Sequence, residues 1–163
     1  MAVSARECGG CTACCTVMQV DALVKPRHTP CPHLSGNGCG IYRSRPAECQ
    51  TFTCFWLIDG SLPDSVRPDR CGLMVWTKRS GFGQAFGSDE TPFLTLAEEV
   101  TPGALDSYWG QKLVKALARR FLILGIRHGQ SVLGAGDARH IFGPPHLVAE
   151  AKAFLEKNGV LEP

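Results

Sequence analysis

The chain has 163 residues, 44% of them hydrophobic, which is enough for one domain with a buried core. Its net charge of +2, without a run of Lys or Arg, argues against nucleic acid or a membrane surface as partner. The best apolar run, residues 121–126, is far shorter than the roughly 20 residues of a spanning helix. The N-terminus also lacks the apolar region of a secretory signal, so we expect a soluble cytoplasmic protein.

Cysteines are numerous and unevenly distributed along the chain. Eight of the nine lie between residues 8 and 54, Cys71 follows, and residues 72–163 have none. In a reducing compartment, clustered cysteines are more often metal ligands or redox catalysts than disulfide partners. We therefore divide the chain into a Cys-rich metal-binding module, residues 1–60, and a second part, residues 61–163, and expect the two to pack as one compact unit.

In chain order, the module shows few periodic segments. Residues 31–40 predict a loop with a tight turn at Gly36-Asn37-Gly38, and residues 61–70, with two prolines, predict a connector. Beyond them, β-branched and aromatic residues predict strands at 72–77 and 92–97, joined by a glycine-rich hairpin loop.

Apolar residues at helical spacing predict a helix that begins at Thr101-Pro102, with Thr101 as its cap, and continues to Phe121. Two strands and a second helix should follow, at residues 122–127, 130–133 and 144–158, with Asn158-Gly159 as the C-cap. The predicted fold class is α+β: an irregular, metal-stabilised Cys-rich module packed on a small unit with short antiparallel strands and two main helices.

The spacing C-x2-C-x2-C-C of the first four cysteines is the main chemical signal. A turn in C-x2-C lets two thiolates converge on one tetrahedral ion. Four more cysteines follow at loop-like intervals. The sequence thus predicts a metal-binding protein with the ligands Cys8, Cys11, Cys14, Cys15, Cys31, Cys39, Cys49 and Cys54.

Cys14 and Cys15 are adjacent, which needs a separate explanation. Neighbouring side chains point in different directions in a strand and about 100° apart on a helix. One small ion can hardly bind both without strain. We therefore hypothesise that the two serve different ions, or that one of them bridges two ions; eight cysteines suffice for two four-sulfur sites.

Zinc and iron–sulfur chemistry both suit tetrahedral sulfur ligands. C-x2-C-x2-C also matches the first three positions of the bacterial ferredoxin run, which continues x3-C-P, whereas Cys15 follows here at once. Cys31, which precedes Pro32, could supply a remote fourth ligand. Zinc is the expected cofactor, and iron or a 4Fe-4S cluster is the alternative.

The segments CGGCTACC (8–15) and CPHLSGNGCGIYRSRPAECQTFTCFW (31–56) resemble the CxxCxxCC cysteine-cluster family of zinc- or iron-chelating domain proteins, which are widespread in bacteria. The resemblance covers about the first third of the chain. It implies metal chelation by the same eight cysteines and supplies no reaction. The stretch between Cys15 and Cys31 is short and contains Pro26 and Pro30, where many relatives have a longer helical segment.

Other polar residues near the cysteines are candidates for supporting roles. Arg43 and Arg45 could offset the negative charge of a thiolate cluster and donate hydrogen bonds to sulfur. Tyr42, beside an isoleucine, is expected to face the core. His28 and His33 lie close in sequence, but with eight cysteines available we do not expect either to be a ligand.

The remaining titratable residues have no expected role in the chemistry. No spacing links His128, His140 and His146 to the cysteines, so ordinary surface or core positions are expected. Cys71 opens a predicted apolar strand and should be a buried core thiol.

Four functions remain open. The leading one is a non-catalytic zinc-binding module, because all-sulfur coordination leaves no position for a substrate. The alternatives are an iron–sulfur protein in electron transfer or sensing, a thiol-based redox enzyme or sensor that uses Cys14 and Cys15, and a labile chelator that transfers zinc or iron to a partner. CGGC lacks the strand and helix context of a thioredoxin-like motif, which disfavours the redox enzyme.

Overall fold

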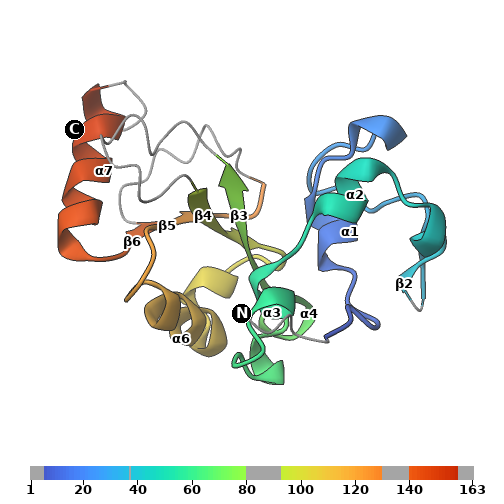
Figure 1. The fold of residues 1–163 in the computed structure, drawn as a ribbon, viewed down its shortest axis with the longest axis horizontal. Helices are drawn as coiled ribbons and strands as arrows, with labels where there is room; N and C mark the ends of the chain where they lie inside the picture. The colour runs from blue at the N-terminus through green and yellow to red at the C-terminus, as the bar shows by residue number, and fades with distance from the viewer. Residues whose placement is uncertain (1–5, 37, 80–92, 130–139, 158–163) are drawn as a thin grey trace.

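The structure is a computed structural model that describes residues 6–36, 38–79, 93–129 and 140–157. Figure 1 shows the N-terminal segment with α1, α2 and β2 on one side of the molecule and the sheet with α6 and α7 on the other. Helices α3 and α4 lie between them. None of the described helices has the length and apolar character needed to cross a bilayer.

The first part of the chain forms only short elements. Its helices have at most five residues, too few to be stable without tertiary contacts. The hairpin pairs Leu34 with Cys39, and its strands flank the predicted turn at 36–38, of which Asn37 lies outside the described residues. The elements are α1 (Ala13–Val17), η1 (Asp21–Leu23), β1 (Leu34–Ser35), β2 (Gly38–Cys39), η2 (Tyr42–Ser44), α2 (Ala47–Thr51), α3 (Phe55–Ile58), η3 (Asp64–Val66) and α4 (Pro68–Cys71).

A four-stranded sheet with the order β3-β4-β5-β6 organises the second part. Its strands are β3 (Leu73–Arg79), β4 (Phe93–Glu99), β5 (Ile123–Ile126) and β6 (Ile141–Phe142). The first three confirm the strands predicted at 72–77, 92–97 and 122–127. The predicted strand at 130–133 and the glycine-rich loop lie outside the described residues.

Short antiparallel strands had been expected, but the sheet is mixed. The β3–β4 and β5–β6 pairs are antiparallel, whereas β4 and β5 run parallel. A parallel pair needs a long crossover connection, and the segment with α6 (Tyr108–Leu117) provides it. Strand β6 has only two residues, too short for a sequence pattern to reveal it.

The predicted helix start at Thr101 is wrong. Gly103 adopts the left-handed conformation, with φ 82°, and a 3₁₀ turn, η4 (Ala104–Asp106), follows it. The cap is instead Ser107, whose Oγ accepts a hydrogen bond from the backbone N–H of Gly110 at 3.0 Å. Helix α7 (Pro145–Lys157) begins where predicted, and its predicted cap lies outside the described residues.

The main hydrophobic core lies against the sheet. Its cluster of buried side chains joins residues of β3, β4, β5 and α6 to Ala13, Val17, Cys54 and Trp56 of the first part. Cys71 is 6% exposed, which confirms the expected core thiol, although it ends α4 rather than opening the strand. The two parts therefore share a core.

A buried carboxylate adds a polar link between the parts. Glu98 on β4 has no exposed side-chain surface and forms an ion pair with Arg27. Its Oε1 lies 3.1 Å from Nε2 of His28, and its Oε2 accepts a hydrogen bond from Trp76 at 3.3 Å. Because Arg27 and His28 precede Cys31 in the chain, this contact fixes the cysteine loop to the sheet.

Candidate metal centre

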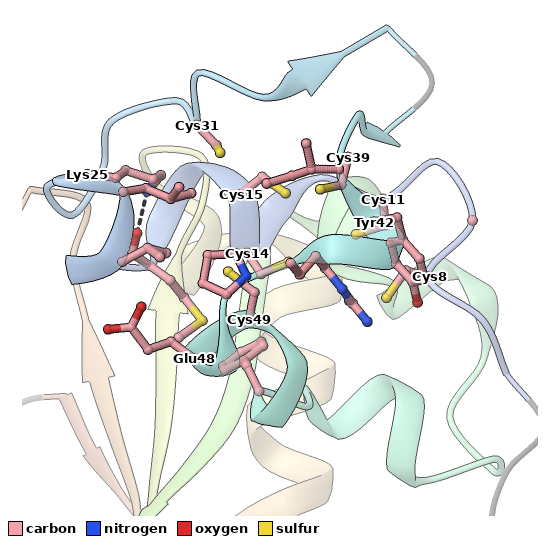
Figure 2. Close-up of a pocket in the computed structure, with 18 residues that line it drawn as sticks. Cys8, Cys11, Cys14, Cys15, Lys25, Cys31, Cys39, Tyr42, Glu48 and Cys49 are labelled. Carbon is pink, nitrogen blue, oxygen red and sulfur yellow. Dashed lines mark hydrogen bonds between the residues drawn. The ribbon is translucent and has the colours of Figure 1, made fainter.

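Seven of the eight predicted ligands line one cavity of about 70 Å³ (Figure 2). Cys54 is the exception, because it is buried and is not among the lining residues. The other residues around the cavity include apolar side chains from the segment after α1 and from both flanks of α2. The cysteines are Cys8, Cys11, Cys14, Cys15, Cys31, Cys39 and Cys49.

A tight turn positions the first cysteines. Gly9 adopts φ +54°, which favours glycine, and the N–H of Cys11 donates to the carbonyl of Cys8 at 3.0 Å. Helix α1 begins two residues later and carries Cys14 and Cys15 side by side. The C-x2-C spacing therefore forms the turn that the sequence predicted.

Lys25, which the sequence analysis missed, closes the loop after α1. Only 3% of the residue is exposed, and its ammonium donates to the carbonyls of Thr16 and Pro26, both at 3.2 Å, and of Met18. Burial lowers the pKa of Lys25, while nearby thiolates, Cys31 first, oppose that shift. Nothing in the sequence pattern around Lys25 separates it from a surface lysine.

The closed loop returns the chain to α1, where the backbone N–H of Cys31 donates to the carbonyl of Cys15 at 2.9 Å. The N–H of Leu34 then donates to the carbonyl of Cys31 at 2.9 Å, and Leu34 pairs with Cys39 across the hairpin. These contacts place Cys31 and Cys39, which are distant from Cys15 in sequence, near that residue.

Glu48 fixes the position of its neighbour Cys49. Its carboxylate accepts hydrogen bonds from the backbone N–H groups of Asp21, at 3.2 Å, and Ala22, at 3.4 Å. This contact ties α2 to η1 and thus to the Lys25 loop. Burial raises the pKa of Cys49, and the charges of Cys15, Cys31 and Cys39 add to the effect.

Cys54 precedes α3 and pairs with Trp76 of β3 through an isolated bridge. Burial raises the pKa of its thiol, whereas the backbone N–H groups of Leu57 and Trp56 favour the thiolate. Cys54 therefore lies at the border between the cysteines and the sheet.

Cys14 and Cys15 form a donor and acceptor pair. The Cys14 thiol donates a hydrogen bond to Cys15, which lowers the pKa of Cys15 to about 6. The positive charges of Lys25 and Arg45 act in the same direction, while burial opposes them. The same hydrogen bond and burial raise the pKa of Cys14. The hydrogen bond thus favours the thiolate form of Cys15 over that of Cys14.

Arg45 lies at the cavity with its guanidinium carbon 3.7 Å from the ring centroid of Tyr42. Its Nε is buried and has no hydrogen-bond partner among the described residues. The expectation that Tyr42 faces the core is wrong: the residue is 51% exposed and covers Arg45 instead. Arg43 is exposed and does not line the cavity.

Neither nearby histidine reaches the cavity. His33 is exposed, and His28 turns to Glu98; its ring also meets that of His128 at a tilt of 59°, with the ring centroids 4.7 Å apart. Sequence spacing could not reveal this pair, because its members come from different parts of the chain. His140 contacts Arg127 at 3.2 Å, and His146 is exposed.

The sulfurs surround the cavity without converging on one point. Within the described ranges, no group of three or more Cys, His, Asp or Glu side chains is arranged to hold a metal ion. A cysteine side chain turns about a single χ1 bond between staggered positions. The donor set suits a soft or borderline metal, and the buried Arg45 Nε is a free donor for a thiolate or sulfide.

Comparison with known proteins gives no match: no family model, curated protein or solved structure is similar to the chain.

Proposed function

We propose that the protein binds metal ions, zinc foremost and two per chain, through the thiolates of its clustered cysteines, without catalysing a reaction. The observation that carries the proposal is the gathering of seven cysteines around one cavity, from segments 41 positions apart in sequence (49 − 8 = 41). If these cysteines had only packing roles, there would be no reason for those of α1, the hairpin and α2 to line the same cavity.

The charges around the cavity also support the proposal. Four thiolates around Zn²⁺ leave a net charge of −2, which must be offset in a partly buried site. Lys25 and Arg45 supply two positive charges beside Cys15, and both lower its pKa. Thiolates are the form that binds metal, so these two charges favour the metal-binding form of Cys15.

A closed four-sulfur site would stabilise the fold rather than activate a substrate. All-sulfur coordination leaves no open position for water, and the free energy of metal binding would become folding free energy for the short elements around it. Membership of the CxxCxxCC family, on the segments that resemble it, is part of the same proposal.

An iron–sulfur cluster is the second candidate. Sulfur ligands suit it equally, and the Nε–H of Arg45, which has no partner in the described part of the chain, is the kind of donor that tunes cluster sulfurs. Electron transfer or sensing would then replace the structural role.

Metal and acid-labile sulfide contents of anaerobically purified protein test both candidates. Two zinc ions per chain without sulfide is the expected result, and iron with an equal amount of sulfide would select the second candidate. Cys71→Ala is the matched control, since Cys71 is buried and does not line the cavity. Wild-type protein that takes up neither zinc nor iron under reducing conditions would overturn the proposal.

A further inference from the structure

We infer that the eight cysteines divide into two four-thiolate sites and that the two exchange metal at different rates. The inner site has Cys8, Cys11, Cys14 and Cys54; the outer site has Cys15, Cys31, Cys39 and Cys49. The inference rests on the proposed function and deepens it, because it assigns the ligands of each ion.

Packing distinguishes the inner site. Cys54 belongs to the hydrophobic core cluster, and Cys11 and Cys14 pack against that cluster. Cys8 joins them through the turn in which Cys11 donates to its carbonyl at 3.0 Å. Electrostatic neighbours agree: the charges of Cys8 and Cys11 act on Cys14, that of Cys54 acts on Cys11, and that of Cys8 acts on Cys54.

Backbone hydrogen bonds assemble the outer site. They join Cys31 to Cys15 at 2.9 Å, and the hairpin then places Cys39 opposite Leu34. The charges of Cys15, Cys31 and Cys39 all act on Cys49. Within the described ranges, these four cysteines neither belong to the core cluster nor pack against it.

The two sites meet at the adjacent pair, where Cys14 donates its hydrogen bond to Cys15. The charge of Cys15 also acts on Cys8, so the two sites lie close together where they meet. After Cys15 itself, the charges that act on Cys14 are those of Cys8 and Cys11, whereas Cys15 has the ammonium of Lys25 as a charged neighbour. Adjacent residues on a helix point about 100° apart, which directs the two sulfurs to different ions.

Different surroundings imply different exchange rates. Release from the inner site requires side chains of the hydrophobic core to separate, which is a costly opening. Cys8, Cys11 and Cys14 of the inner site also line the cavity, so the two sites differ in their support. The outer ligands lie on loops and short elements held mainly by hydrogen bonds of Lys25 and Glu48. Such loops open locally at a lower free energy, so the outer ion should leave first.

The test loads the reduced full chain with Zn²⁺ alone and follows its release to a chromogenic chelator. Wild type should release two ions (8 thiolates / 4 per ion = 2) in two phases of equal amplitude. Cys31→Ser should lose the fast phase and retain one slow ion. Cys54→Ser should lose the slow phase and retain one fast ion, with Cys11→Ser as the second inner variant if Cys54→Ser does not fold.

Double variants decide the partition. Cys31→Ser combined with Cys49→Ser should retain one ion, because both belong to the outer site, whereas Cys31→Ser combined with Cys11→Ser should retain none. Cys71→Ala should retain both ions. Loss of both ions from the outer double variant, or one shared release phase, overturns the partition, while wild type that binds no zinc overturns the proposed function itself.

Discussion

The sheet and the cysteine segment, residues 6–36 and 38–58, bury their side chains to different extents. In the sheet, Leu73, Met74, Leu96, Ile123 and Ile126 are all below 2% exposed. Of the apolar side chains of residues 6–36 and 38–58, only Val17 reaches that level. Burying such a side chain is worth about 1.5–3 kcal/mol, so the sheet has most of the hydrophobic stabilisation.

The cysteine segment uses directed polar contacts instead. Lys25 and Glu48 each hold backbone groups of the loop, and Arg6 donates to the carbonyls of Trp56, Asp59, Gly60 and Leu62. Such bonds specify one conformation but contribute only about 0.5–1.5 kcal/mol each. The difference implies that the sheet relies mainly on hydrophobic burial, part of it in the shared core, while the cysteine segment depends on a further source of free energy.

If the protein binds zinc as proposed, removing that zinc should give the largest effect. Structural zinc binding contributes on the order of 10 kcal/mol in small zinc modules. We expect chelation to lower hydrogen-exchange protection in α1, α2 and the hairpin strongly, while β3, β4 and β5 keep theirs. Equal loss of protection in both regions would contradict the comparison, and addition of Zn²⁺ should restore the protected state.

Replacing Lys25 should weaken the cysteine segment next. Lys25→Met leaves three part-buried carbonyls without their donor, at a cost of about 3 kcal/mol in the free energy of unfolding. Urea unfolding of the metal-free chain measures the change. Lys115→Met, an exposed position, is the control and should change it by less than about 0.5 kcal/mol. Equal midpoints for the two variants would show that Lys25 has no structural role.

Glu98→Gln should loosen the link between the regions. The amide keeps the shape but removes the charge that Arg27 and His28 face, and Arg27 is 24% exposed, so we expect a loss of about 2 kcal/mol. Hydrogen exchange should accelerate in the loop that carries both residues more than in β5. Glu150→Gln, at an exposed position, serves as the control. Unchanged exchange in that loop would mean that the shared core alone joins the regions.

The smallest effect concerns pH. In the metal-free chain, Cys15 has a pKa of about 6, below the ordinary cysteine value of about 8.5. Its contribution to stability is therefore fully present above the ordinary value and is lost as the pH falls through about 6. Mass spectrometry of iodoacetamide labelling should show half-maximal reaction of Cys15 near that pH. Cys14→Ala should move the midpoint upward; a midpoint at the ordinary value in wild type would refute the hydrogen-bonded pair.

Sequence patterns predicted the sheet better than the cysteine segment. Strands β3, β4 and β5 follow runs of β-branched and aromatic residues, and α7 follows its prolines, because local preference and burial agree there. The start of α6 was missed because Gly103 breaks the helical course, a conformation that composition does not encode. Among the predicted metal ligands, the C-x2-C spacing predicted the turn between Cys8 and Cys11. Lys25, Tyr42 and the His28–His128 contact depend on loop closure and could not be foreseen.

The hydrogen bonds of Arg6 have a mechanical consequence. Arg6 precedes Cys8 by two residues. Its guanidinium donates to four carbonyls at and after the end of α3 and lies over the Trp56 ring, 4.6 Å from the ring centroid. A pulling force applied ahead of residue 6 is therefore borne by α3 rather than by the cysteine turn. An affinity tag attached there should leave the cysteines around the cavity unstrained.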